Sequence, residues 1–306
     1  NVGDGTILNA TTTSVASAGS YNINVTQLAK AQTISSAGQV STTDTIGSGA
    51  STTITFQFGT ISGGSLTNGV YTGASFAQDA DQAIGTVTID SSNNSLQGIR
   101  DAINAAGKGV TASIVGDGSA TPYHLVLSSN KTGATSSLKI DVSGDAALQS
   151  LLSYDPAGTQ NLKETTTGQN ANLSINGINI TSASNTVNDA VQGAAITLSK
   201  VGSTTLNLSN NTSGVQNSIN GFVKAYNDLQ ATFKSLTGFD AATKKGGVLT
   251  GDAAARGAQS QVRNALSSAV NGLGGNITTL SSIGISFQKD GTLSVDSTKL
   301  QNALTN

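Results

Sequence analysis

Residues 212–238, TSGVQNSINGFVKAYNDLQATFKSLTG, divide the chain into two parts with different hydrophobic patterns. Large apolar side chains recur in this stretch at steps of three and four, namely Val215, Ile219, Phe222, Val223, Tyr226, Leu229, Phe233 and Leu236. This spacing predicts an amphipathic helix of about six turns. Thr212 or Ser213 can serve as its N-cap, and Gly238 follows its predicted end. Because the apolar stripe must be covered, the helix needs a partner.

The segment after Thr250 offers that partner. Its apolar residues repeat the helical spacing, and most of them are small: Ala258, Val262, Ala265, Leu266 and Ala269. Small side chains allow two helices to approach closely, so we expect a helical pair. We expect Phe222, Tyr226 and Phe233 in the core of this pair rather than in a surface that binds another protein, although one stripe can serve both purposes.

A short hairpin and a third helix follow this pair. Residues 285–295 predict a hairpin around Asp290-Gly291, and Asp296 can cap a final helix. We therefore assign residues 210–306 to a mainly α-helical domain with a small hairpin.

Before residue 210, the pattern is typical of strands separated by turns. Residues 172–181, NLSINGINIT, predict a hairpin, because Asn176-Gly177 suits a type I′ turn in which both residues have positive φ. Residues 21–27, YNINVTQ, alternate apolar and polar side chains as a strand does. Residues 195–198 and 205–208 are expected to form a second hairpin that closes around Gly202.

Strands and helices alternate between residues 85 and 152, which predicts an α+β domain. Asn94 or Ser95 can cap its first helix and Gly107 can end it, while Asp145 can cap a second, shorter helix. Upstream, Ile54, Phe56 and Phe58 mark a strand, and residues 62–81 are expected to form a long surface loop.

The composition is poor in the groups that enzymes and metal sites use. The 306 residues include no Cys, Met or Trp, one His and one Glu, and only 10% are charged. The net charge of −2 gives no electrostatic footprint for nucleic acid, and no apolar run is long enough to insert in a membrane. The absence of Met leads us to expect a fragment or a processed chain, and the first ten residues lack the pattern of a signal peptide.

Each candidate for chemistry has a simpler structural interpretation. His124 has no second His or Cys for a metal site, and Glu164 stands alone in a polar stretch. Asp79 and Asp81 resemble half of a calcium loop but lack the Gly and Glu of an EF-hand. Residues 106–109 fall at a predicted helix end, where a phosphate is disfavoured. We therefore predict no catalytic, cofactor-binding or metal-binding residue and no cofactor, and we interpret the chain as a structural protein that contacts other proteins.

Several blocks of the sequence together resemble the bacterial flagellar filament cap family, also called hook-associated protein 2. These blocks occur in the family's order: YNINVTQLAKAQTISS at 21–36, SLQGIRDAINAAGKGVTASIV at 95–115, NLSINGINITSASNTV at 172–187, NSINGFVKAYNDLQATFKSLTGFD at 217–240, GVLTGDAAARGAQSQVRNAL at 247–266 and IGISFQKDGTLSVDSTKL at 283–300. The similarity covers most of the chain except the Gly- and Ser-rich stretch from Ser41 to Asp81.

The resemblance implies a multidomain fold in which one head domain is inserted in another. A β-rich head domain would comprise residues 1–47 and 181–209, an inserted outer α+β domain residues 48–180, and the helical domain residues 210–306, leading to a coiled-coil leg that is absent here.

The resemblance also implies a function without enzymatic activity. A family member would be exported without a cleaved signal peptide and would form a homo-oligomeric ring, most often a pentamer, at the extracellular tip of the flagellum. There it would prevent the loss of flagellin and promote its polymerisation, next to flagellin and the hook–filament junction proteins. The interface residues are unknown at this stage, although we expect the two head domains to carry the ring contacts. The alternative is a surface adhesin that binds host glycans or proteins through the outer domain, above all through residues 62–81.

Overall fold

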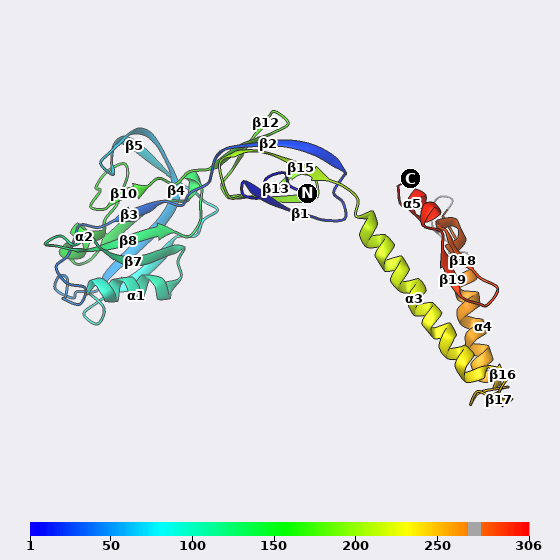
Figure 1. Ribbon diagram of the computed structural model, residues 1–306. Helices are drawn as coiled ribbons and strands as arrows, with labels where there is room; N and C mark the ends of the chain where they lie inside the picture. The colour runs from blue at the N-terminus through cyan, green and yellow to red at the C-terminus, as the bar shows by residue number, and fades with distance from the viewer. Residues whose placement is uncertain (269–276, 306) are drawn as a thin grey trace. The chain divides into compact units, whose positions relative to one another are not determined.

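The computed structural model describes residues 1–268 and 277–305. They form two compact units, Asn1–Ser209 and Asn210–Asn306, so the chain divides where the hydrophobic pattern changes. The fold is a mixed α/β architecture with β-rich head domains and a helical unit, as the sequence predicted (Figure 1).

The first unit contains an inner β domain made of two sheets. One sheet has the order β1–β14–β13, from Leu8–Thr12, Ala194–Leu198 and Thr186–Val191. The other has the order β12–β11–β2–β15, from Ile178–Ser182, Ala171–Ile175, Gly19–Gln27 and Gly202–Leu208. Alternate apolar residues of these strands, such as Ile23, Val25, Leu173 and Ile196, form its buried core.

The same unit contains an outer α+β domain with its own core. Its strands are β3 Thr33–Ser35, β4 Thr52–Thr67, β5 Val70–Gln78, β6 Gly85–Ile89, β7 Val110–Gly116, β8 Tyr123–Ser129, β9 Ser137–Ser143 and β10 Lys163–Thr166. Its helices are α1 Leu96–Ala106, α2 Ala146–Leu152 and a 3₁₀ turn at Ala134–Ser136. One sheet has the order β10–β3–β8–β7, and in the other β4 lies between β6 and β9 and then pairs with β5. Three residues of α1, namely Leu96, Ile99 and Ile103, are buried in the same hydrophobic core as Phe56 of β4 and Leu125 of β8.

The predicted helix caps of the outer domain are confirmed. Ser95 accepts a hydrogen bond from Gly98 N at 3.1 Å, Gly107 ends α1 with φ 59°, and Asp145 accepts from Ala147 N at 2.8 Å. The Asn176-Gly177 turn also has the predicted positive φ angles, 49° and 84°. Local sequence therefore sets these element ends.

The borders of the insertion differ from those predicted at residues 47/48 and 180/181. The core of the outer domain already contains Ile34, whereas the inner core contains Ala29. The chain returns to the inner core between Leu162 and Ala171, so the 172–181 hairpin belongs to the inner domain. Its strand β11 pairs with β2, which explains the assignment.

Two local predictions in this unit are wrong. Residues 62–81 do not form a loop, because β4 and β5 pair as a long hairpin through an Asn68-Gly69 turn. Residues 195–198 and 205–208 do not pair with each other: β14 joins β1 and β13, whereas β15 joins β2.

The described residues of the second unit form three helices and two short hairpins. Its elements are α3 Thr212–Thr237, β16 Phe239–Asp240, β17 Lys245–Gly246, α4 Ala253–Ser267, a 3₁₀ turn at Leu280–Ile283, β18 Ile285–Phe287, β19 Leu293–Val295 and α5 Ser297–Thr305. The β18–β19 hairpin and the Asp296 cap, which accepts from Lys299 N at 3.0 Å, confirm the prediction. The N-cap of α3 is Asn211, one residue before the predicted Thr212, and it accepts from Gly214 N at 2.9 Å.

The helical pair packs differently from the expectation. Val262 and Leu266 of α4 do contact the small core, but Ala258 and Ala265 are exposed, and Ala269 lies outside the described residues. The buried side of α3, Val223 and Tyr226, shares a core with Ile285 and Leu293 of the β18–β19 hairpin. The hairpin therefore packs against a part of the apolar side of α3 that we expected α4 to bury.

Candidate functional surfaces and polar clusters

Within residues 1–268 and 277–305, no three side chains of the His, Cys, Asp or Glu type lie close enough to hold a metal ion. In the same described residues, no helix is long and apolar enough to cross a membrane.

Both ring nitrogens of His124 are engaged in contacts within the outer domain. Its Nδ1 donates to the carbonyl of Ser36 at 2.8 Å, and its Nε2 lies 3.2 Å from Asp117 Oδ2. The hydrogen bond to Ser36 raises the pKa of His124, and Asp117 adds to this effect. Since both contacted oxygens can only accept, they favour the imidazolium, in which both ring nitrogens donate.

Glu164 does not stand alone, contrary to the sequence interpretation. Its carboxylate is buried in the outer domain, where it accepts hydrogen bonds from Gln32 Nε2, from the Tyr71 hydroxyl at 3.0 Å and from the Tyr154 hydroxyl at 3.3 Å. Burial, followed by the nearby charge of Glu164, raises the pKa of both tyrosines. The phenols therefore stay protonated as donors. No sequence signal brings these four residues together, because they come from segments far apart in the chain.

Asp79 and Asp252 have turn and cap roles. Asp79 accepts from Asp81 N at 3.0 Å and from Gln82 Nε2 at 3.0 Å, so its carboxylate closes a turn. Asp252 caps α4 by accepting from Ala255 N at 2.8 Å. Residues 106–109 lie at the C-terminal end of α1, as expected, which does not favour a phosphate.

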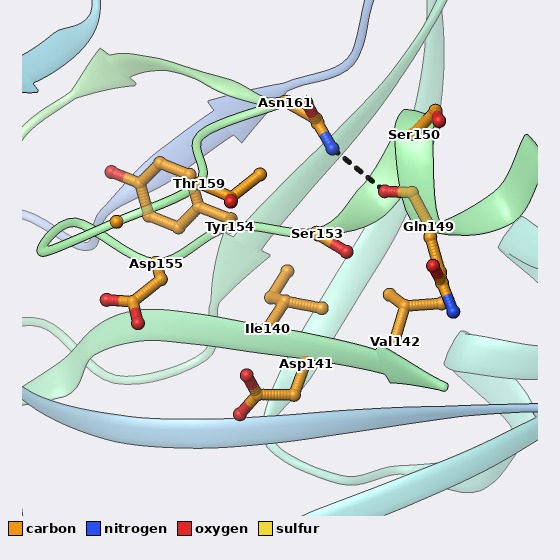
Figure 2. Close-up of a pocket in the computed structure, with 11 residues that line it drawn as sticks. Ile140, Asp141, Val142, Gln149, Ser150, Ser153, Tyr154, Asp155, Thr159 and Asn161 are labelled. Atoms are coloured by element: carbon orange, nitrogen blue, oxygen red, sulfur yellow. Dashed lines mark hydrogen bonds between the residues drawn. The ribbon is translucent and has the colours of Figure 1, made fainter. Parts of the chain in front are cut away.

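A pocket of about 540 Å³ opens between β9, α2 and the loop that follows α2 (Figure 2). Its walls are mostly polar and include two carboxylates, Asp141 and Asp155. Both are already engaged: Asp155 pairs with Lys139 at 2.9 Å, and Asp141 accepts from Gln57 Nε2 at 2.9 Å. Asn161 Nδ2 donates to the carbonyl of Gln149 at 2.9 Å across the wall, as the dashed line in Figure 2 shows. The Lys139–Asp155 pair and the Asn161–Gln149 hydrogen bond hold the loop against β9 and α2.

The helical unit keeps part of its apolar stripe exposed. Val215, Phe222 and Leu229 occur at seven-residue intervals on α3, and their side chains are 48%, 41% and 41% exposed. The expectation that Phe222 belongs to the core is therefore wrong, whereas Tyr226 is buried and confirms it. The helix has two apolar faces, one covered within the unit and one that faces outward.

The fold and these surfaces define a multidomain protein whose polar clusters stabilise turns, caps and segment junctions. A crystal structure of the D1–D2–D3 domains of the flagellar cap protein FliD from Escherichia coli matches it with a TM-score of 0.81 at 36% identity, over 98% of this chain and 77% of that chain. The chain belongs to the flagellar hook-associated protein 2 family, the flagellar cap proteins.

Other comparisons agree with this assignment. The model of the flagellar hook-associated protein 2 C-terminus matches residues 168–306, and that of the flagellin hook IN motif matches residues 78–131. Flagellar hook-associated protein 2 of Escherichia coli O157:H7 is 36% identical over 98% of this chain and 62% of its own length. The homologue from Salmonella typhimurium is 38% identical over 71% of this chain and 48% of its own length. The chain thus spans about three-fifths or less of the length of these curated relatives.

Proposed function

We propose that the full-length protein caps the distal end of the bacterial flagellar filament, where it promotes flagellin polymerisation and prevents the loss of flagellin. The observation that carries this proposal is the match to the Escherichia coli flagellar cap protein over 98% of the chain. A cap acts by geometry and contact rather than by bond chemistry. This fits a chain whose buried polar groups, such as Glu164 and Asp145, are engaged in holding segments together.

A ring of identical subunits, most often five by the family resemblance, is part of the proposal. The inner β domain offers a suitable surface for it, because the four strands of the β12–β11–β2–β15 sheet contain no charged residue. Asn24, Ser174 and Ser203 lie on its outer face and present amides and hydroxyls, which both donate and accept. Identical faces of this kind can meet without repulsion between like charges.

The helical unit supplies a second contact surface. The exposed face formed by Val215, Phe222 and Leu229 is apolar and extends along α3. Exposed apolar patches of this kind mark protein contacts. Flagellin and the hook–filament junction proteins are the proposed partners, at the extracellular tip of the flagellum after export without a cleaved signal peptide.

The test is the distribution of flagellin in cells that lack the protein. We expect few filaments and abundant monomeric flagellin in the medium, with filaments restored by the full-length protein. Complementation with a variant from which only residues 210–306 are deleted is the control, and it should leave flagellin in the medium. Normal filaments without the protein would contradict the cap function, and binding of glycans or host proteins by the outer domain would then be the alternative to measure.

A further inference from the structure

The long β4–β5 hairpin is attached to the rest of the outer domain at both of its ends and is free between them. The first half of β4 pairs with β6 and β9, but from Ser62 to Thr67 it pairs only with β5. In the described part of the chain, β5 pairs with no strand other than β4. Residues 62–68 are exposed.

Three glycines interrupt the hairpin near its middle. Gly63, Gly64 and Gly73 have φ angles of 69°, 66° and 72°, in the left-handed region. A Cβ atom on Gly64 would lie 2.5 Å from the carbonyl oxygen of Thr72, so no larger residue fits there. Glycine also has more conformational freedom than other residues. The break therefore provides a hinge between the base of the hairpin and its tip.

The tip is held by hydrogen bonds to the segment around β10. Glu164 N donates to the carbonyl of Gly69 at 2.8 Å, and the Tyr71 hydroxyl donates to the Glu164 carboxylate at 3.0 and 3.1 Å. Tyr71 N donates to Gln160 Oε1 at 2.7 Å, and Gln160 Nε2 donates back to the carbonyl of Tyr71 at 2.9 Å. The Asn68–Tyr71 tip is thus attached to one segment at two of its residues, Gln160 and Glu164.

The hydrogen bond from the Tyr71 hydroxyl to the Glu164 carboxylate is the strongest contact between the tip and the rest of the domain. Glu164 is 7% exposed, and in the described part of the chain its carboxylate accepts from the neutral side chains of Gln32, Tyr71 and Tyr154. A hydrogen bond to an ionised acceptor is about twice as strong as one between neutral groups. Gln32 and Tyr154 belong to the body of the domain, so Tyr71 is the donor that connects the carboxylate to the hairpin.

We propose that the β4–β5 hairpin is a strap with a glycine hinge at Gly63, Gly64 and Gly73 and a latch at Tyr71 and Glu164. It can open at the tip while the α+β core stays folded. Opening removes one of the three side-chain donors of Glu164 and exposes its carboxylate to water. Glu164 is a positioning residue in this proposal, because it fixes where the strap lies.

Hydrogen exchange of the full chain tests the strap. Tyr71→Phe removes only the hydroxyl. We expect the amides of Tyr71 and Glu164, whose hydrogen bonds join the tip to the segment around β10, to exchange at least about tenfold faster, because a hydrogen bond to a charged group is lost. Exchange in α1 and β8 should not change. Tyr123→Phe is the matched control, since the Tyr123 hydroxyl makes no hydrogen bond to the residues that the structure describes, and it should leave the exchange of Tyr71 and Glu164 as in the parent. Unchanged exchange at Tyr71 and Glu164, or equal acceleration throughout the outer domain, would overturn the proposal.

A distance measurement gives an independent result that does not depend on exchange chemistry. The chain has no Cys, so spin labels can be placed at Ser65→Cys and Lys163→Cys, two exposed positions on the strap and beside the latch. We expect one short distance in the labelled parent and an added longer population when Tyr71→Phe or Glu164→Gln is introduced. A single unchanged distance in both variants would refute an opening strap.

Discussion

Asn227 on α3 binds both backbone polar groups of Leu293 on β19. Its Nδ2 donates to the Leu293 carbonyl at 2.9 Å, and its Oδ1 accepts from Leu293 N at 2.8 Å. The side-chain amide thereby takes the place of a neighbouring strand along the free edge of the β18–β19 hairpin. This contact sets the position of the hairpin on the helix, next to the buried Val223 and Tyr226.

Replacing Asn227 should therefore weaken the helical unit. Asn227→Ala leaves the backbone groups of Leu293 unpaired in a half-buried position, and we expect a loss of about 1–3 kcal/mol in the free energy of unfolding. Urea denaturation of the chain, followed by the signal of the helical unit, measures the loss. Asn220→Ala, an exposed asparagine of the same helix, is the control and should change stability little. Equal effects of the two substitutions would refute the role of the contact.

The two faces of α3 should respond differently to truncation. Tyr226 is buried, meets Phe287 edge to face at 6.0 Å and donates to the Gly291 carbonyl at 3.1 Å, so Tyr226→Ala should cost about 3–5 kcal/mol. Phe222 is 41% exposed, and Phe222→Ala should cost less than about 1 kcal/mol. Denaturant unfolding of both variants checks the difference. A large loss of stability in Phe222→Ala would mean that Phe222 is part of the buried core in solution.

The elements that the sequence predicted well are those whose signal is local. The α1 cap at Ser95, the Asn176-Gly177 turn and the Asp296 cap each depend on a few consecutive residues, and the structure has all three. The Asn68-Gly69 turn carries the same signal as Asn176-Gly177. The Gly- and Ser-rich residues around it lack a regular apolar alternation, so the sequence pattern does not predict the two strands of this hairpin.

Partners that are distant in the sequence could not be predicted in this way. The pairing of β15 with β2 instead of β14, and the convergence of Gln32, Tyr71 and Tyr154 on Glu164, follow from the topology of the whole unit. The apolar stripe of an amphipathic helix likewise does not identify the element that packs against it. The apolar stripe of α3 predicts that another element packs on the helix. It does not predict which residues of the stripe contact the β18–β19 hairpin, because that depends on the tertiary packing.

The single histidine makes one pH dependence simple to measure. The Ser36 carbonyl and, to a lesser extent, Asp117 stabilise the imidazolium and raise the pKa of His124 above its ordinary value of ~6.5. This stabilisation is fully present below pH ~6.5 and is lost as the pH rises through the raised pKa. NMR titration should show one histidine with a midpoint above the ordinary value. Asp117→Asn should lower the midpoint, and a midpoint that does not move would exclude the Asp117 contact in solution.

Asp145 should make the outer domain sensitive to acid. Its carboxylate accepts from Ser48 N and Ser48 Oγ, both at 2.6 Å, and from Ala147 N at 2.8 Å. These bonds, above all the one from the Ser48 hydroxyl, lower the pKa of Asp145 to about 2. Because the folded pKa lies below the ordinary value of ~3.9, the carboxylate stabilises the fold above that value, and the effect is lost as the pH falls towards 2.

Asp145→Asn should accordingly be less stable than the parent near neutral pH and should approach it in acid. Asparagine cannot accept from Ser48 and from the end of α2 with the strength of a charged group, so the difference at neutral pH measures the carboxylate. Thermal unfolding of both proteins at a series of pH values from 7 to 2 provides the comparison. Asp44→Asn, which changes an exposed carboxylate, is the control and should show no such convergence. A stability difference between Asp145→Asn and the parent that stays constant across this range would mean that the Ser48 contacts do not depend on the charge of Asp145.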